Sequence, residues 1–170
     1  MNNSALVSII IPAYNPEFFE SALNSAIGQN WTNIEIIICD DSQDDTIRVI
    51  SEQYIQKSSL PIKYFKNKTR LGEVGNVLRC LSETQGKYVK FLYDDDIIHP
   101  DCISRLVVAL NSHDDNRLAA CRRIRIDEDD QLLADIHATA YPFEGDVILN
   151  GRDAISFFAD YTINFIGETR

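Results

Sequence analysis

Two short runs of β-branched residues constrain the fold of this chain most strongly. Residues 6–12 read Leu-Val-Ser-Ile-Ile-Ile-Pro, and residues 34–39 read Ile-Glu-Ile-Ile-Ile-Cys. Both runs are nearly continuous in apolar residues, whereas a strand with one solvated face would alternate apolar and polar residues. Strands that are apolar on both faces are typical of parallel sheets covered by helices. The two runs therefore predict an α/β protein.

The rest of the first 110 residues alternates between strands and amphipathic helices, which predicts parallel βαβ units. Further strands are expected at 62–65 and 88–93. Helices are expected from Asn15-Pro16 to about Gln29, over 45–56, from Gly72 to before Gly86, over 102–111 and over 150–161. Farther on, a strand at 118–126, an acidic turn at 127–130 and a short strand at 132–133 predict a hairpin and hence a mixed sheet. With no repeat or linker, residues 1–170 are interpreted as one domain.

Composition and charge exclude several classes of protein. The formal net charge of −10 argues against nucleic acid as a partner, because binding to its backbone needs a basic face. No apolar run reaches the roughly 18 residues of a transmembrane segment, and no signal peptide is recognised. The 4 cysteines show no CxxC spacing and are interpreted as buried free thiols. A cytoplasmic protein is therefore expected.

Polar clusters follow three of the predicted strands. They are Ala13-Tyr14-Asn15, Asp40-Asp41-Ser42 and Asp94-Asp95-Asp96. Ligands of an open parallel sheet bind beyond the carboxyl ends of its strands, which is where these clusters are expected to lie. A single aspartate at such a place often only caps the next helix. Three clusters together indicate a binding site.

The triple aspartate is the most specific of these clusters. Three adjacent carboxylates repel one another, so they need either solvent or a cation. Hard oxygen ligands of this kind favour magnesium, manganese or calcium over zinc, and they leave coordination positions for water and ligand phosphates. A metal site is the prediction, and a solvated acidic turn is the alternative.

The other candidates are less specific. Asp40 or Asp41 could accept a hydrogen bond from a base or a ribose hydroxyl, and Tyr14 could stack on a base. Arg70 could pair with a diphosphate or be a solvated surface arginine. His99 could contact the metal or a phosphate, although a histidine at the start of a helix is the simpler interpretation. The chain has no GxSxG, Walker A or GxGxxG motif.

Three blocks of the sequence closely resemble the glycosyltransferase family 2 domain of GT-A fold. They are Val7-Ser-Ile-Ile-Ile-Pro-Ala-Tyr-Asn15, Ile36-Ile-Ile-Cys-Asp-Asp-Ser42, and Gly86-Lys-Tyr-Val-Lys-Phe-Leu-Tyr-Asp-Asp-Asp96 with Pro100-Asp101. They occur in the family's order and spacing, and the resemblance covers roughly residues 5–112. It implies a Rossmann-like α/β/α sandwich with a mostly parallel central sheet.

The resemblance also implies a set of site residues. Those expected to bind the nucleotide are Pro12, Ala13, Tyr14, Asn15, Asp40, Asp41, Arg70 and Asp94. Asp41 matches the family's uracil-binding aspartate best and Asp40 second. Aligned on Pro100, the family's Asp-x-Asp-Asp element falls on residues 93–96, with Tyr93 in place of its first aspartate. Asp95, followed by Asp96, is then the expected metal ligand, although a literal DxD would be Asp94 and Asp96.

The function implied by the resemblance is an inverting glycosyl transfer with Mn²⁺ or Mg²⁺. The expected donor is a nucleotide sugar, most simply a UDP-sugar, and the expected acceptor is a hydroxyl group of a saccharide or of a lipid-linked acceptor. Such enzymes typically serve bacterial surface polysaccharide synthesis, in the cytoplasm or peripherally at the inner face of the membrane. The family's catalytic base lies in the acceptor-binding half. No residue is assigned to it here, Glu168 included, and the domain is expected to be truncated before the end of that half.

Alternatives of other classes remain. A truncated module could bind a nucleoside diphosphate without transferring a sugar. A sugar nucleotidyltransferase would normally carry a glycine-rich basic loop after its first strand, where this chain has Ala13-Tyr14-Asn15. A receiver-type signalling domain would place its acidic pair after the first strand, whereas Asp40-Asp41 follows the second.

Overall fold

The computed structural model describes residues 5–136, 139 and 142–161 of the chain. The chain divides into two compact units, Met1–Val107 and Val108–Arg170. The first unit contains β1 (Val7–Ala13), α1 (Phe19–Ile27), β2 (Ile34–Asp40), α2 (Thr46–Lys57), β3 (Ile62–Lys66), α3 (Gly72–Ser82) and β4 (Tyr88–Phe91). Helix α4 (Cys102–Asn111) crosses the division between the units, and α5 (Gly151–Tyr161) belongs to the second. Among the described residues, no helix is long and apolar enough to cross a membrane.

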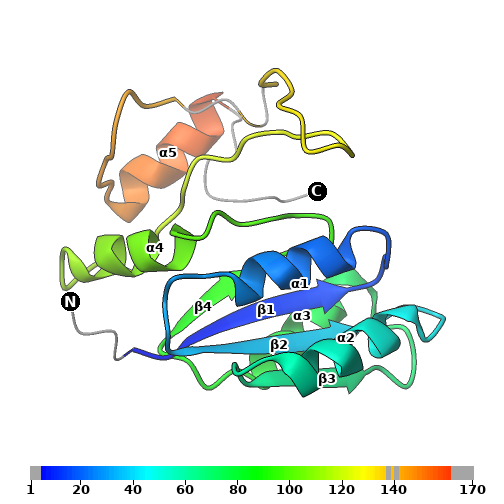
Figure 1. Ribbon diagram of the computed structural model, residues 1–170. Coiled ribbons are helices and arrows are strands. Elements are labelled where there is room, and N and C mark those ends of the chain that lie inside the picture. Colours follow the sequence, from blue (N-terminus) through cyan, green and yellow to red (C-terminus); the bar gives the residue numbers. More distant parts are fainter. Residues whose placement is uncertain (1–4, 137–138, 140–141, 162–170) are drawn as a thin grey trace. The chain divides into compact units, whose positions relative to one another are not determined.

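The four strands form one parallel sheet in the order β3-β2-β1-β4. The predicted α/β fold with a mostly parallel sheet is therefore confirmed. The mixed sheet is not, since within the described residues the antiparallel pairing of Ile126 with Leu132 lies outside this sheet. Helices α1 and α2 pack on one face of the sheet and α3 on the other (Figure 1). The chain builds outward from β1 to β3 and then returns to place β4 on the other side of β1. The connections consequently diverge between β1 and β4, which is the position where sheets of this kind bind ligands.

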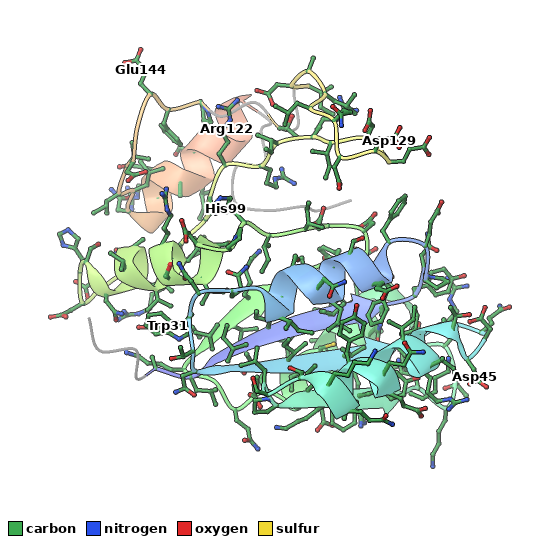
Figure 2. All side chains as sticks on the ribbon, in the orientation of Figure 1. Trp31, Asp45, His99, Arg122, Asp129 and Glu144 are labelled. Carbon is green, nitrogen blue, oxygen red and sulfur yellow. The ribbon has the colours of Figure 1, made fainter. Side chains whose placement is uncertain are left out.

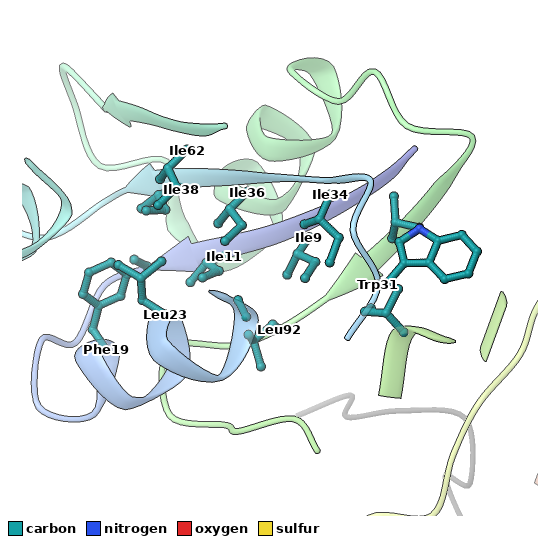
Figure 3. Close-up of a cluster of buried hydrophobic side chains, with 14 of the residues drawn as sticks. Ile9, Ile11, Phe19, Leu23, Trp31, Ile34, Ile36, Ile38, Ile62 and Leu92 are labelled. Carbon is teal, nitrogen blue, oxygen red and sulfur yellow. The ribbon is translucent and has the colours of Figure 1, made fainter. Parts of the chain in front are cut away.

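The two β-branched runs are buried on both faces of the sheet, as predicted. Every residue of β1 and of β2 is buried. Figure 3 shows the core on one face, which includes Ile9, Ile11, Ile36 and Ile38 together with Phe19 and Leu23 of α1. The alternate residues Ile10, Ile37 and Cys39 pack against Cys80 of α3 on the other face. Each fully buried isoleucine or leucine contributes about 1.5–3 kcal/mol relative to an exposed one.

Several predicted boundaries shift for local reasons. Helix α1 begins at Phe19 rather than at Asn15-Pro16, because the Asn15 side chain accepts the backbone N–H of Glu17 (3.2 Å) and forms a turn instead of a helix cap. Strand β4 ends at Phe91 rather than Tyr93, since a turn that joins the Asp96 N–H to the Tyr93 carbonyl (3.2 Å) follows it. The helix expected over 150–161 is confirmed as α5.

The prediction of a strand at 118–126 is wrong. In the described part of the second unit, the only strand pairing is an antiparallel bridge between Ile126 and Leu132, across the predicted acidic turn. Leu118 and Ile124 are 61% and 60% exposed. An apolar β-branched segment becomes a strand only where a partner strand and a covering layer bury it. The cysteine prediction needs a smaller correction, because Cys121 is exposed while the other three are buried.

A buried glutamate joins three strands at the amino end of the sheet. Glu35 of β2 is 3% exposed and accepts hydrogen bonds from Ser8 Oγ (2.6 Å), Lys63 Nζ (2.8 Å) and the Gln85 N–H (2.7 Å). The Gly86 N–H donates to Ser8 Oγ (2.8 Å), and a Cβ on Gly86 would lie 2.6 Å from Ser8 N, so only glycine fits. Burial raises the pKa of Glu35, but the hydrogen bonds from Lys63, Ser8 and Gln85 outweigh it and leave the pKa below its ordinary value.

We predict that Glu35→Gln lowers the free energy of unfolding by about 2 kcal/mol at neutral pH, as expected for hydrogen bonds to a charged group. Because the folded pKa lies below the unfolded value, the ionised carboxylate stabilises the fold above the ordinary pKa of 4.5. This contribution disappears as the pH falls through the folded pKa. Urea denaturation between about pH 7 and about pH 2 should therefore show the variant and wild type converging in acid.

The matched control is Glu52→Gln, which changes an exposed glutamate paired with Arg48 on α2. It should alter the free energy of unfolding by less than about 1 kcal/mol. An equal effect of the two substitutions, or a difference from wild type that grows in acid, would contradict the role given to Glu35.

Candidate functional site

Asp94 joins the segment after β4 to the segment after β1. Its Oδ2 accepts the backbone N–H groups of Tyr14 (2.6 Å) and Asn15 (2.7 Å). These N–H groups follow the last residue of β1 and lie beyond the ladder that pairs β1 with β2 and β4. The structure thus brings two of the three predicted polar clusters together, at the point where the chain connections diverge.

The environment of Asp94 acts on its ionisation in two directions. Burial raises the pKa of Asp94, the hydrogen bonds from Tyr14 and Asn15 lower it, and the neighbouring charge of Asp95 raises it; the net shift is upward. The Asp94 carboxylate is therefore engaged by the polypeptide itself, and it fixes the conformation of the loop between β1 and α1.

Asp95 and Asp96 are exposed beside this contact. Among the described residues, no group of three or more His, Cys, Asp or Glu side chains is arranged to hold a metal ion. Magnesium and related hard cations are commonly held by one or two carboxylates, with water and substrate phosphates completing the coordination. Two exposed carboxylates fit such an ion when a diphosphate supplies further ligands. The metal site stays a prediction.

His99 lies in the segment that leads into α4 (Figure 2). Its side chain is 75% exposed, and its Nδ1 accepts the backbone N–H of Asp101 (3.2 Å). The His99 carbonyl accepts the N–H of Cys102, the first residue of α4 (2.8 Å). These contacts agree with the interpretation of His99 as a residue that starts a helix.

Asp40 lies at the end of β2 and is fully buried. Its Oδ2 accepts hydrogen bonds from the Tyr64 hydroxyl (2.6 Å) and from Lys66 Nζ (3.0 Å), and its Oδ1 accepts the Ser42 N–H (2.8 Å). Burial, followed by the hydrogen bond to the Asp40 carboxylate, raises the pKa of Tyr64. These donors direct the Asp40 side chain toward β3.

Asp41 holds the beginning of α3. Its Oδ2 accepts the Gly72 N–H (2.8 Å), and its Oδ1 accepts the Leu71 N–H (2.8 Å) and the Asn67 side-chain amide (3.0 Å). Gly72 has a φ of 73°, a left-handed conformation that favours glycine. With 5% of its surface exposed, Asp41 lies just below the surface where the predicted nucleotide residues gather.

Tyr14 and Arg70 contact each other. The Arg70 guanidinium lies 4.3 Å from the centroid of the Tyr14 ring, and Tyr14 is 45% exposed. This contact joins the loop after β1 to the loop before α3. Pro12 and Ala13 are buried at the end of β1, where the Ala13 carbonyl accepts the Asp41 N–H (2.8 Å).

Sequence reasoning missed two asparagines of this region. Asn67 and Asn76 lie within hydrogen-bonding distance of each other (2.9 Å) behind Asp41. The sequence contained one indication of this network. Asn76 is a polar residue four positions before the apolar Cys80, which places both on the same side of α3, and both are buried. Buried asparagines need hydrogen-bond partners, so this position could have been recognised as part of a polar network.

Comparison with known proteins identifies close similarities. The family model described as Glycosyl transferase family 2 matches residues 8–162. The chain is 37% identical over 108 residues to the GalNAc(5)-diNAcBac-PP-undecaprenol beta-1,3-glucosyltransferase of Campylobacter jejuni, which covers 62% of this chain and 34% of that protein.

Two solved structures are also similar. The structure of S. aureus TarS 1–349 in complex with UDP-GlcNAc is 28% identical, with a TM-score of 0.54 over 62% of this chain and 30% of that one. Mannosyltransferase PcManGT of Pyrobaculum calidifontis, in complex with GDP-Man and Mn²⁺, has a TM-score of 0.59 over 64% of this chain and 33% of that one. Its 20% identity supports the fold alone. The chain thus spans about a third of the length of these proteins.

We predict that Asp94→Ala lowers the free energy of unfolding by about 1–3 kcal/mol, because the Tyr14 and Asn15 N–H groups lose their acceptor. Asp94→Asn should retain most of that stability at neutral pH, since the amide oxygen can accept the same hydrogen bonds. The upward pKa shift of Asp94 means that the fold does not favour the charged form of this group. Urea denaturation of the two variants checks the prediction, and equal losses in both would contradict it.

Proposed function

Because this chain belongs to glycosyltransferase family 2 and has the GT-A fold, we propose that it binds a nucleotide-sugar donor at the carboxyl ends of β1 and β4 and takes part in transferring the sugar to a hydroxyl acceptor. The observation that carries the proposal is the Asp94 contact with Tyr14 and Asn15. It places the exposed Asp95 and Asp96 next to the loop that carries Tyr14.

The proposed donor is a UDP-sugar. The base would lie near Tyr14 and Arg70, whose aromatic and guanidinium planes both suit stacking on a base. A carboxylate offers about four acceptor positions. The Asn67, Leu71 and Gly72 donors make four contacts with Asp41, because the Leu71 N–H is shared between Oδ1 (2.8 Å) and Oδ2 (3.1 Å). The imino N–H of uracil would take the place of the longer Leu71 contact. The similarity to a structure that contains UDP-GlcNAc supports the same choice.

The proposed cofactor is Mn²⁺ or Mg²⁺, with Asp95 as the leading ligand and Asp96 beside it. When bound, the ion would neutralise charge that develops on the leaving diphosphate. Asp94 would act differently from its neighbours, since its carboxylate holds the backbone of the loop that receives the nucleotide.

The proposed reaction is a direct displacement with inversion. The acceptor oxygen forms a bond to the anomeric carbon, the bond from that carbon to the diphosphate oxygen breaks, and the acceptor proton passes to a base. No described residue is assigned as that base, and Glu168 lies outside the described residues. We further propose that the acceptor is a saccharide or is linked to a lipid, and that the product is a bacterial surface polysaccharide. The reaction would take place in the cytoplasm or at the inner face of the membrane.

A module that only binds a nucleoside diphosphate remains the second candidate. It shares the donor site described above and differs in turnover alone. Release of UDP from a UDP-sugar, dependent on an added acceptor, would separate transfer from binding.

We predict that the chain binds UDP in the presence of Mn²⁺ and that Asp95→Ala weakens this binding at least about tenfold, equivalent to about 1.4 kcal/mol. Removing a carboxylate ligand should abolish most of the gain that the metal gives, so affinities with and without Mn²⁺ should converge in the variant. Isothermal titration calorimetry with UDP, with and without Mn²⁺, measures both quantities.

The matched control is Asp129→Ala, which removes an exposed aspartate from the acidic turn of the second unit (Figure 2). Its UDP affinity should equal that of the wild type. Failure of the wild type to bind either UDP or GDP with Mn²⁺, together with unchanged metal affinity in Asp95→Ala, would rule out the proposed site.

A further inference from the structure

A buried side-chain amide connects the ends of the two central strands to α3. Asn76 is 2% exposed, and its Nδ2 donates to the carbonyl oxygens of Cys39 (2.9 Å) and Ala13 (3.3 Å). Cys39 directly precedes the Asp40-Asp41-Ser42 cluster, and Ala13 is the first residue of the Ala13-Tyr14-Asn15 cluster. Asn76 therefore fixes the position of α3 along the strand direction, relative to the carboxyl ends of β1 and β2.

A second amide connects Asn76 to Asp41. The Asn67 Nδ2 donates both to Asn76 Oδ1 (2.9 Å) and to Asp41 Oδ1 (3.0 Å). The orientation of both amides follows from these partners. Because the NH₂ group of Asn76 faces two carbonyls, its oxygen must face Asn67, and Asn67 must present its own NH₂ group to Asp41.

The hydrogen bonds of Asp41 extend this chain of contacts to the surface. Asp41 receives the N–H groups of Leu71 and Gly72, which begin α3. Arg70 directly precedes Leu71 and stacks on Tyr14. Asn67 thus acts on Asp41 by direct contact, and Asn76 acts on Asp41 through Asn67. Both act on Arg70 through the backbone that Asp41 holds.

Burying the Asn76 amide and partly burying that of Asn67 has a free-energy penalty that apolar residues of similar size would avoid. Every side-chain hydrogen bond described above for the pair ends on Asp41, on a strand-end carbonyl or on the partner amide. A network with this arrangement fixes the orientation of a carboxylate, whereas apolar packing could only fill the space.

We propose that Asn67 and Asn76 are positioning residues for nucleotide recognition, which orient the Asp41 carboxylate and the Arg70 loop toward the base. The inference rests on the proposed function, because it concerns the base side of that donor site. Neither asparagine needs to touch the nucleotide. Their effect should appear in the binding of ligands that carry a base and be absent for ligands that consist of phosphate alone.

The experiment compares Asn67→Ala with Glu35→Gln in the full chain. Asn67 is half-buried and lies outside the hydrophobic core, so its truncation should leave the fold intact. We expect Asn67→Ala to weaken UDP binding about tenfold and to leave the binding of inorganic diphosphate with Mn²⁺ unchanged. Glu35→Gln perturbs the buried polar cluster at the other end of the sheet, and it should lower the thermal midpoint without changing UDP affinity.

Three outcomes would overturn the inference. They are wild-type UDP affinity in Asn67→Ala, an equal loss for UDP and inorganic diphosphate, and an equal loss of UDP affinity in Glu35→Gln. Each would mean that Asn67 contributes to stability alone or to the whole site without distinction.

A second measurement needs no ligand and keeps the inference separate from the proposed function. Amide hydrogen exchange at Leu71 and Gly72 should accelerate in Asn67→Ala, while exchange in α1 stays at the wild-type rate. Absence of UDP and GDP binding in the wild type would refute the proposed function. Unchanged exchange at Leu71 and Gly72 would refute the positioning of Asp41 by Asn67.

Discussion

The parallel pairing of β1 with both β2 and β4 is the constraint on which the rest of the first unit depends. It makes β1 one of the two central strands, buries the strand on both faces, and places the segment after β4 alongside the end of β1. Beyond the end of β1, the backbone N–H groups of Tyr14 and Asn15 need another acceptor, and Asp94 supplies it from the segment after β4. The same pairing that forms the core therefore also brings the acidic segment 94–96, which comes after β4 in the chain, next to the residues that follow β1.

The two ends of the sheet use buried polar groups in different ways. At the amino end, Glu35 joins Ser8 of β1, Lys63 of β3 and the chain before β4, so its partners connect the strands to one another. At the carboxyl end, Asp40 is directed toward β3, whereas Asp41 holds the beginning of α3 next to the exposed Tyr14 and Arg70. The first cluster serves the fold. The second lies beside the proposed nucleotide site, so a conformational change of its loops would alter that site.

The strands of the first unit were well predicted from the sequence, because runs such as Ile36-Ile-Ile38 are typical of a strand with two buried faces. The sequence also predicted which strand ends carry polar side chains. It could not predict that Asp40 is fully buried and directed toward Tyr64, or that Asn67 and Asn76 lie behind Asp41, because these facts depend on contacts between distant segments. The strand expected at 118–126 failed for the same reason. Its residues have the composition of a strand, but a strand also requires a partner, which local composition does not reveal.

The stack of Arg70 on Tyr14 has a consequence for how affinity at this site should be interpreted. A base that stacked on the same face of Tyr14 would replace a cation–π contact worth about 0.5–1 kcal/mol at an exposed position. Binding there would be an exchange of one stacking partner for another, and the measured affinity would report only the difference between the two. A weak nucleotide affinity would then be compatible with strong contacts in the complex, because Arg70 already contacts the Tyr14 ring in the protein without nucleotide.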